Sequence, residues 1–254
     1  MIIIKTAEEV RTMREAGRIV GEVLALMREK VRPGVSTLEL DRLAESWIRK
    51  RGAIPSFLGY PPGSRNPFPA TICASVNEEL VHGIPSARRV LQEGDIITVD
   101  VGAFYRGYHG DAAITLPVGT ISPEAQALLE VTSDALNAAL AQATAGRRLG
   151  DISHAIQTCV ESRGYYVTRI YTGHGIGRHL HEDPQVLNYG QAGQGVLLRR
   201  GMTLAIEPMV LIGSGQTRTL ADGWTVVSAN GRLTAHFEHT VAITDGEPEI
   251  LTLV

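Results

Sequence analysis

The chain has 254 residues and is 44% hydrophobic, which is enough to bury a full core in one large domain or two small ones. Its formal net charge of -3 provides no overall basic field, which argues against a protein that binds nucleic acid by neutralising phosphates. The two cysteines lack CxxC or zinc-knuckle spacing, and no run approaches the roughly 18 apolar residues of a membrane span, so we expect a cytoplasmic protein without a disulfide framework.

Helical patterns occur as two pairs. The first pair covers Ala7 to about Arg28, which opens on a capping box, and Ser36 to the helix-stopping Gly52. The second pair covers Ser122 to about Ala143 and Asp151 to Arg163. Each pair precedes a stretch of strand-like sequence, so the two pairs divide the chain into similar parts.

The two parts show a weak internal repeat. Gly34 to Gly52 spans 18 positions, as does Gly146 to Gly164, at an offset of 112 residues. Chance agreement between two amphipathic helices is the alternative. The repeat predicts a single domain, residues 1–254, made of two related halves at approximately 1–118 and 119–254.

Strand-like segments follow each helix pair. They lie at residues 70–77, 95–105 and 108–116 in the first half, and at 165–171, 202–212, 224–228 and 233–244 in the second. Runs of helices followed by runs of strands predict an α+β fold with antiparallel sheet rather than alternating βαβ units. The inner strands of the two halves would then line a cleft, which is the expected place for a ligand.

A β-hairpin with two carboxylates is predicted at residues 95–111. With Arg106-Gly107 as a two-residue loop, Asp100 lies opposite Ala113, and Asp111 projects from the same face roughly 7–8 Å away at the backbone. Two carboxylates on one half-buried face repel and desolvate each other, and a divalent cation relieves both costs. A one-residue register change would send Asp111 to the other face, leaving a surface aspartate and a capping one as the alternative.

Two more carboxylates occupy apolar strand patterns. Glu207 and Glu238 each place a charge where burial is costly unless it is paired or coordinated, although either alone could be a structural salt-bridge partner. Pro208 indicates that its strand ends or lies at a sheet edge. His174 lies in a glycine-rich segment that matches a dinucleotide fingerprint only weakly. Four carboxylates and one imidazole without a thiolate suit Mn(II), Fe(II), Co(II) or a non-structural Zn(II) pair.

The chain resembles the methionine aminopeptidase family, in its short bacterial type I form, in five ordered segments: VNEELVHGIP, DVGAFYRGYHGD, GHGIGRHLHEDP, AIEPMV and HFEHT. The resemblance covers nearly the whole chain. It implies the pita-bread (creatinase/aminopeptidase-like) fold, in which two pseudo-symmetric helix-helix-strand halves surround a central antiparallel sheet. It also implies an exopeptidase that removes the initiator methionine when the second residue is small, through a hydroxide activated by two metal ions.

The resemblance assigns roles to individual residues. Glu207 would carry a proton from the water to the leaving amine, His82 would contact the peptide nitrogen after the methionine, and His181 would stabilise the oxyanion by roughly 3–4 kcal/mol. The family's metal ligands map to Asp100, Asp111, His174, Glu207 and Glu238, which would hold two divalent ions (Co, Mn, Fe or Zn). The methionine side chain would pack against Tyr60, Phe68, Cys73 and Trp224.

The remaining histidines receive no catalytic role. We expect His236 and His239 to be structural or to lie behind the ligands, and His109 and His179 to occupy surface or loop positions. The chain departs from the family pattern in the proline-rich segment 61–72 and at His179-Leu180, which affects the rim and wall of the pocket.

The expected partners are nascent polypeptide N-termini, with the ribosome as a candidate, no specific nucleic acid, no membrane, and a monomeric state. An X-Pro aminopeptidase or prolidase of the same fold is the first alternative, although such enzymes usually carry an additional N-terminal domain. The second is a non-catalytic pita-bread module that binds nucleic acid or protein. Such a module could lose metal ligands, whereas this sequence keeps all five.

Overall fold

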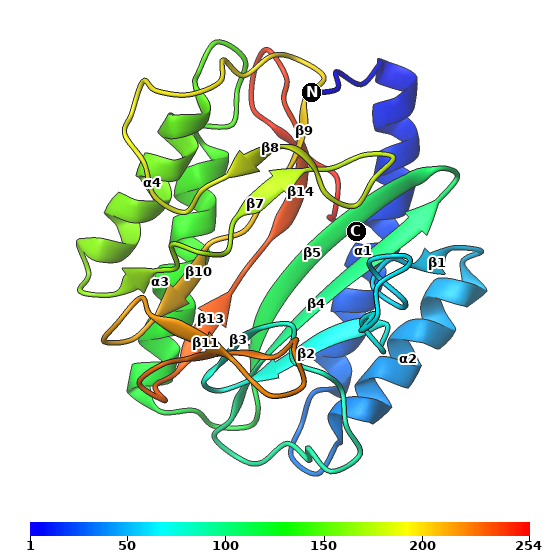
Figure 1. Cartoon of the computed structure of the whole chain (residues 1–254), viewed down its shortest axis with the longest axis vertical. Coiled ribbons are helices and arrows are strands. Elements are labelled where there is room, and N and C mark those ends of the chain that lie inside the picture. Colours follow the sequence, from blue (N-terminus) through cyan, green and yellow to red (C-terminus); the bar gives the residue numbers. More distant parts are fainter.

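The computed structural model describes residues 1–254 and contains two helix pairs (Figure 1). The helices are α1 (Ala7–Lys30), α2 (Thr37–Lys50), α3 (Pro123–Leu140) and α4 (Leu149–Glu161). All four coincide with predicted helices. The predicted capping box at Thr6 is present, since its hydroxyl accepts the Glu9 N–H while the Glu9 carboxylate accepts the Thr6 N–H. No helix combines the length and apolar character needed to cross a bilayer.

The strands form four sheets, all with antiparallel pairing. The first sheet contains β1 (Ile54–Pro55), β4 (Ile96–Tyr105), β2 (Ile72–Val76) and β5 (Tyr108–Pro117), and the second β13 (Thr234–His236), β10 (Met209–Leu211) and β6 (Tyr166–Val167). The third contains β11 (Thr217–Thr219), β12 (Val226–Ser228) and β3 (Glu79–Val81), and the fourth β15 (Glu249–Ile250), β14 (His239–Ala242), β9 (Thr203–Ile206), β7 (Gly173–Gly175) and β8 (Glu182–Val186). The α+β class with antiparallel sheets agrees with the prediction.

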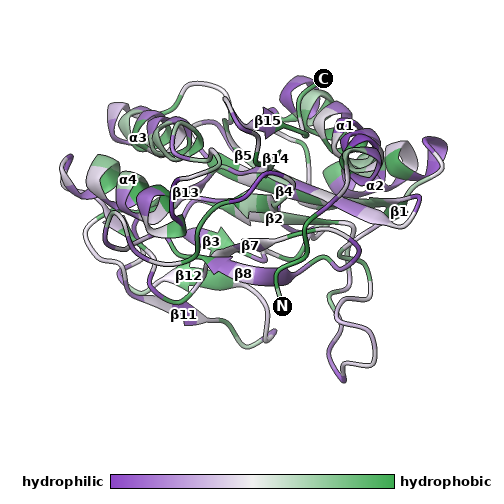
Figure 2. Ribbon diagram, turned by 90° about the horizontal axis from the view of Figure 1, so that it is seen from above, coloured by the Kyte–Doolittle hydropathy of each residue, from purple (hydrophilic) through white to green (hydrophobic).

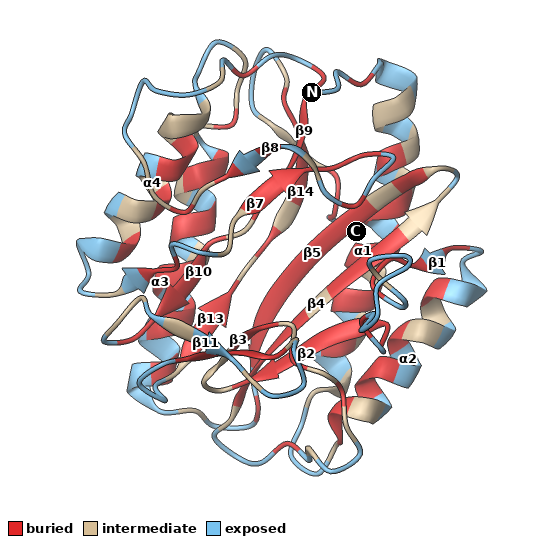
Figure 3. Cartoon of the chain, in the orientation of Figure 1, coloured by how far each residue is buried: buried red, intermediate tan, exposed pale blue.

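Both helix pairs lie on the same side of the strands, α1 with α2 at one end and α3 with α4 at the other, and the long central strands are largely buried (Figures 1, 2 and 3). A cluster of 21 buried apolar residues lies between α1, α2 and the first sheet, and a cluster of 24 lies beneath α3 and α4. Helix α1 approaches β5 closely because Gly17 and Gly110 face each other, and a side chain on Gly110 would come within 2.7 Å of the Gly17 nitrogen. Each half of the chain thus has its own core.

Strand β5 joins the two halves through hydrogen bonds to the strands of the second half. The Thr115 hydroxyl donates to the His236 carbonyl at 2.9 Å, and the Glu238 N–H donates to the Ala113 carbonyl at 2.9 Å. The Thr240 hydroxyl donates to the Asp111 carbonyl at 2.7 Å. These bonds bring Asp111 alongside Glu238. The duplication of the halves itself stays a prediction.

The predicted continuous strands at 202–212 and 233–244 were wrong, because each is interrupted at its centre. Glu207 and Pro208 separate β9 from β10, and Phe237 and Glu238 separate β13 from β14. Proline has no N–H to donate to a ladder, so the chain leaves one sheet and enters another at this point. The register is the same on both sides, with Ile206 opposite His239 and Met209 opposite His236, which sets Glu207 opposite Glu238.

Candidate metal centre

The hairpin formed by β4 and β5 has the register predicted from its sequence. Arg106 and Gly107 both have positive φ, 48° and 88°, as a two-residue turn with the twist of a β-hairpin requires. Asp100 therefore lies opposite Ala113, and Asp111 lies two residues along on the same face. The local sequence alone places two carboxylates side by side.

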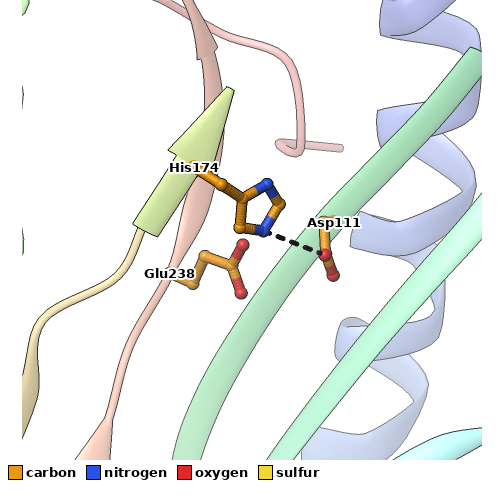
Figure 4. A group of neighbouring side chains, drawn as sticks. All are labelled: Asp111, His174 and Glu238. Carbon is orange, nitrogen blue, oxygen red and sulfur yellow. Dashed lines mark ion pairs between the residues drawn. The ribbon is translucent and has the colours of Figure 1, made fainter. Parts of the chain in front are cut away.

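Three more donors approach this pair from the second half of the chain. Ligand atoms of Asp111, His174 and Glu238 all lie within 4.8 Å of one another, and the three residues come from β5, β7 and the break before β14 (Figure 4). His174 Nε2 lies 3.9 Å from Asp111 Oδ2 and 3.6 Å from Glu207 Oε1. One imidazole thus faces carboxylates from two separate sheets.

The glycines around His174 let its strand fit between two neighbours. A side chain on Gly173 would come within 2.4 Å of the Ala205 carbonyl oxygen, and one on Gly175 within 2.1 Å of the Asp183 carbonyl oxygen. His174 Nδ1 lies 2.9 Å from the Gly175 carbonyl oxygen, which can only accept a hydrogen bond. The proton is therefore on Nδ1, and the lone pair of Nε2 points toward the carboxylates, as a metal ligand requires.

The carboxylates have no cationic partner in the cavity that they line, because no lysine or arginine is among its residues. Asp100 Oδ1, Asp111 Oδ1 and Glu238 Oε1 are buried without a hydrogen-bond partner. Burial raises the pKa of Asp100 to about 7. Burial, followed by repulsion from Glu238 and Asp100, raises the pKa of Asp111, and burial first also raises the pKa values of Glu207 and Glu238. Such a set fits hard divalent cations, which would keep these acids ionised.

These raised pKa values predict how the stability of metal-free protein depends on pH. Between the unfolded pKa near 4 and the folded pKa of about 7 for Asp100, this group binds more protons in the native state than in the unfolded state, so its contribution to stability falls as pH rises. Buried histidines with lowered pKa values, such as His174 and His236, contribute the opposite slope below about pH 6.5, so the carboxylate contribution is measured as a difference. In chelator-treated protein, the Tm of Asp100→Asn minus that of the unmodified protein should rise by about 5 °C from pH 5.5 to pH 8. Thermal denaturation across this range measures it.

The matched variant is Asp100→Asn, which should flatten this slope in metal-free protein because it removes one titrating group. A Tm difference between the two proteins that stays constant from pH 5.5 to pH 8 would contradict the assignment of Asp100 as a buried, uncompensated acid.

The eleven site residues predicted from the sequence all line a single cavity of about 280 Å³. The carboxylates and His174 form its polar end. Its apolar part includes all four residues expected around a methionine side chain, Tyr60, Phe68, Cys73 and Trp224. The rings of Phe68 and Trp224 meet edge to face, with centroids 5.2 Å apart. The cavity thus combines a carboxylate-rich end with a pocket sized for an apolar side chain.

The two departures from the family pattern both bear on this pocket. The proline-rich segment is exposed from Pro61 to Pro67 and then turns Phe68 inward, where it is 3% exposed. The Trp224 indole N–H donates to the Asn66 carbonyl at 3.1 Å, which fastens the segment to the opposite rim. Leu180 is 3% exposed and lines the cavity, so an aliphatic side chain forms this part of the wall.

Two histidines stand at the junction of the polar and apolar parts. His82 has a positive φ of 60°, which is uncommon for a residue other than glycine and typical of functional sites. Its ring meets those of Tyr171 and Trp224 edge to face. His181 Nδ1 lies 2.6 Å from the Tyr60 hydroxyl, and the His181 ring centroid lies 4.4 Å from that of His174.

The histidines without an assigned role take different positions. His236 is buried beside the carboxylates, with Nε2 3.5 Å from Glu207 Oε2 and 3.9 Å from Glu238 Oε2, which fits a place behind the ligands. The placement of His109 at the surface or in a loop was wrong: it lies in β5, half-buried, with Nδ1 2.8 Å from the Ser56 hydroxyl. His179 lies in an exposed loop, and His239 contacts the Thr252 hydroxyl.

The cavity also has wall residues that the sequence reasoning missed. Tyr171 and Thr172 precede His174 by three and two positions, and Met209 follows Glu207 by two. Their only signal in the sequence is this proximity to a ligand, which is too weak to separate them from ordinary core residues.

Comparison with known proteins gives matches over the whole chain. The sequence model of metallopeptidase family M24 matches residues 11–245. A methionine aminopeptidase of Clostridium acetobutylicum is 55% identical over 253 residues, covering 100% of this chain and 99% of the relative. Methionine aminopeptidase 1 of Bacillus subtilis is 55% identical over 254 residues, with 100% of both chains covered.

Solved structures agree with these matches. The crystal structure of methionine aminopeptidase from Thermotoga maritima is 46% identical, covers 100% of both chains and superimposes with a TM-score of 0.96. Prolidase from Pyrococcus furiosus, at 24% identity, shares the fold with a TM-score of 0.79, and the match covers 99% of this chain but 66% of the prolidase. The predicted pita-bread fold is thereby confirmed.

Proposed function

The chain belongs to metallopeptidase family M24, and from that premise we propose that it is a methionyl aminopeptidase, a hydrolase that removes the N-terminal methionine from nascent proteins and peptides. The observation that carries the proposal is one cavity with unpartnered buried carboxylates at one end and an apolar pocket at the other. The first end suits a metal-assisted attack on an amide, and the second suits a thioether side chain.

The metal ligands that we propose are Asp100, Asp111, His174, Glu207 and Glu238. Their oxygen-rich set with one imidazole would hold a pair of divalent ions, whose identity depends on cellular supply. When bound, the pair supplies Lewis-acid activation of water and of the scissile carbonyl. His236, buried behind Glu207 and Glu238, would orient both carboxylates.

The residues of the pocket bind and orient the substrate. The methionine side chain packs between Phe68, Trp224 and Tyr60, which keeps water from the apolar part of the cavity. His82, held by its strained backbone, contacts the peptide nitrogen that follows the methionine. Glu207 accepts a proton from the attacking water and delivers it to the leaving amine, because its carboxylate faces both the ligand cluster and the open cavity.

Tyr60 fixes the tautomer that His181 needs. A neutral imidazole carries one proton, and His181 can donate to a developing oxyanion through Nε2 only if Nδ1 is an acceptor. Burial lowers the pKa of His181 and raises that of the Tyr60 hydroxyl, which favours the neutral form of both groups. We assign the hydroxyl as the donor across the 2.6 Å contact because the oxyanion role requires Nδ1 to accept. Nε2 then carries the proton and is free to hydrogen-bond the substrate.

The likeness to proline-directed peptidases extends only to the fold, so substrate choice separates the two activities. We expect protein reconstituted with Mn(II) or Co(II) to hydrolyse Met-Ala-Ser and to leave an X-Pro tripeptide intact, with small second residues preferred. Chromatographic quantification of free methionine measures the reaction. Hydrolysis of the proline peptide alone would reverse the assignment, and a lack of turnover of any N-terminal methionine peptide would favour a binding module.

The proposed partners are the N-termini of nascent polypeptides. We propose that the protein encounters them at the ribosome. The proposed state is a monomer, since one chain supplies all eleven proposed site residues.

A further inference from the structure

A buried ion pair joins the start of the chain to the loop that carries His181. Lys5 Nζ lies 2.5 Å from Glu182 Oε2, and each side chain is only 3% exposed. The two residues are separated by 177 positions in the sequence. Neither belongs to the cavity, and neither has a role in the proposed reaction.

The loop between β7 and β8 connects two residues of the proposed site. It follows His174 in β7 and ends at His181, directly before Glu182 at the start of β8. The Glu182 carboxylate also accepts the backbone N–H of His179 at 3.1 Å through Oε1. One oxygen of the Glu182 carboxylate therefore fixes the backbone at His179, two residues before His181, and the other oxygen binds Lys5.

Gly177 and the backbone of Lys5 leave room for the ion pair and hold the lysine in place. A side chain on Gly177 would come within 2.5 Å of Lys5 Cε and 2.7 Å of Glu182 Oε1, so the loop leaves space at this position for the ion pair. The Lys5 backbone is held as well, because its N–H donates to the Gly201 carbonyl at 2.7 Å. Lys5 Nζ also donates to the Ile3 carbonyl at 3.3 Å. Lys5 is thus held both at its backbone and at its ammonium group.

We propose that Lys5 and Glu182 are positioning residues for the hydrolysis, and that their ion pair holds the 176–182 loop so that His181 Nε2 points into the cavity. A buried pair contributes little net stability compared with an apolar or neutral replacement, because both charges lose their hydration. Its geometry is nevertheless specific. The inference rests on the proposed function, since that function assigns the oxyanion contact to His181.

The test compares single and double variants. Lys5→Met alone leaves a buried carboxylate without a partner and should lower the Tm sharply. The double variant Lys5→Met/Glu182→Gln removes both charges, and Gln still accepts the His179 N–H, so its Tm should return close to that of the unmodified protein. If the pair positions His181, kcat for Met-Ala-Ser stays reduced by about 10- to 100-fold in the double variant, with KM unchanged.

A second readout does not depend on turnover. Hydrogen exchange of the amides at 176–182 should be faster in the double variant than in the unmodified protein, because the loop has lost its buried anchor. The control is Arg163→Met/Asp134→Asn, which removes a half-exposed pair with a 2.6 Å contact between α3 and the turn just after α4. Its kcat and loop exchange should be unchanged.

The outcomes separate this inference from the proposed function. If the unmodified protein does not release methionine, the proposed function fails. If it does, and the double variant retains a kcat within about twofold of it with unchanged loop exchange, the positioning role is wrong. A double variant that does not fold would also overturn it, since the pair would then maintain the structure rather than orient His181.

Discussion

Replacing Glu207 with Gln is expected to leave the fold intact and to reduce kcat for Met-Ala-Ser by about 10²- to 10⁴-fold. The amide has nearly the same shape as the carboxylate, so the break between β9 and β10 should keep its geometry. What is lost is the negative charge that faces His174 and the group that carries the proton to the leaving amine. Steady-state kinetics with saturating Mn(II), together with a thermal denaturation curve, measure both effects.

The matched control is Glu247→Gln, which changes the same functional group at an exposed position in the turn after β14. Its kcat should equal that of the unmodified protein. Turnover of the Glu207→Gln variant at nearly the unmodified rate would remove Glu207 from the mechanism. A large fall in Tm would instead show that the carboxylate is needed for folding.

The local parts of this site could be predicted from sequence. The hairpin is specified by its two-residue turn, so its register and the shared face of Asp100 and Asp111 followed from neighbouring residues. The four helices were equally predictable, because their caps and apolar periodicity are local signals. Charges within apolar strand patterns also singled out Glu207 and Glu238, and the structure places both in the lining of the cavity.

Other parts depend on contacts that no local pattern encodes. The breaks at Glu207 and at Glu238 arise because the chain passes between two sheets, and a continuous apolar run does not show where one sheet ends. The contact between Tyr60 and His181 joins residues 121 positions apart, and that between Lys5 and Glu182 joins residues 177 apart. Such partners become visible only when the two halves are placed against each other.

Removing divalent ions is expected to have the largest effect, with methionine release falling by more than about 10³-fold, because the proposed metal site would supply the activation of water and the polarisation of the carbonyl. The buried acids should then take up protons, since burial and mutual repulsion raise their pKa values. Loss of activity on chelation should therefore be reversible. Re-addition of Mn(II) or Co(II) should restore turnover without refolding.

The most direct measurement is a titration of chelated protein with Mn(II), followed both by metal analysis of the protein and by release of methionine from Met-Ala-Ser. We predict that activity rises with bound metal and reaches its maximum by two ions per chain, and that Asp111→Asn lowers the bound metal as well as the activity. Full activity in protein shown to contain no divalent ion would contradict the account.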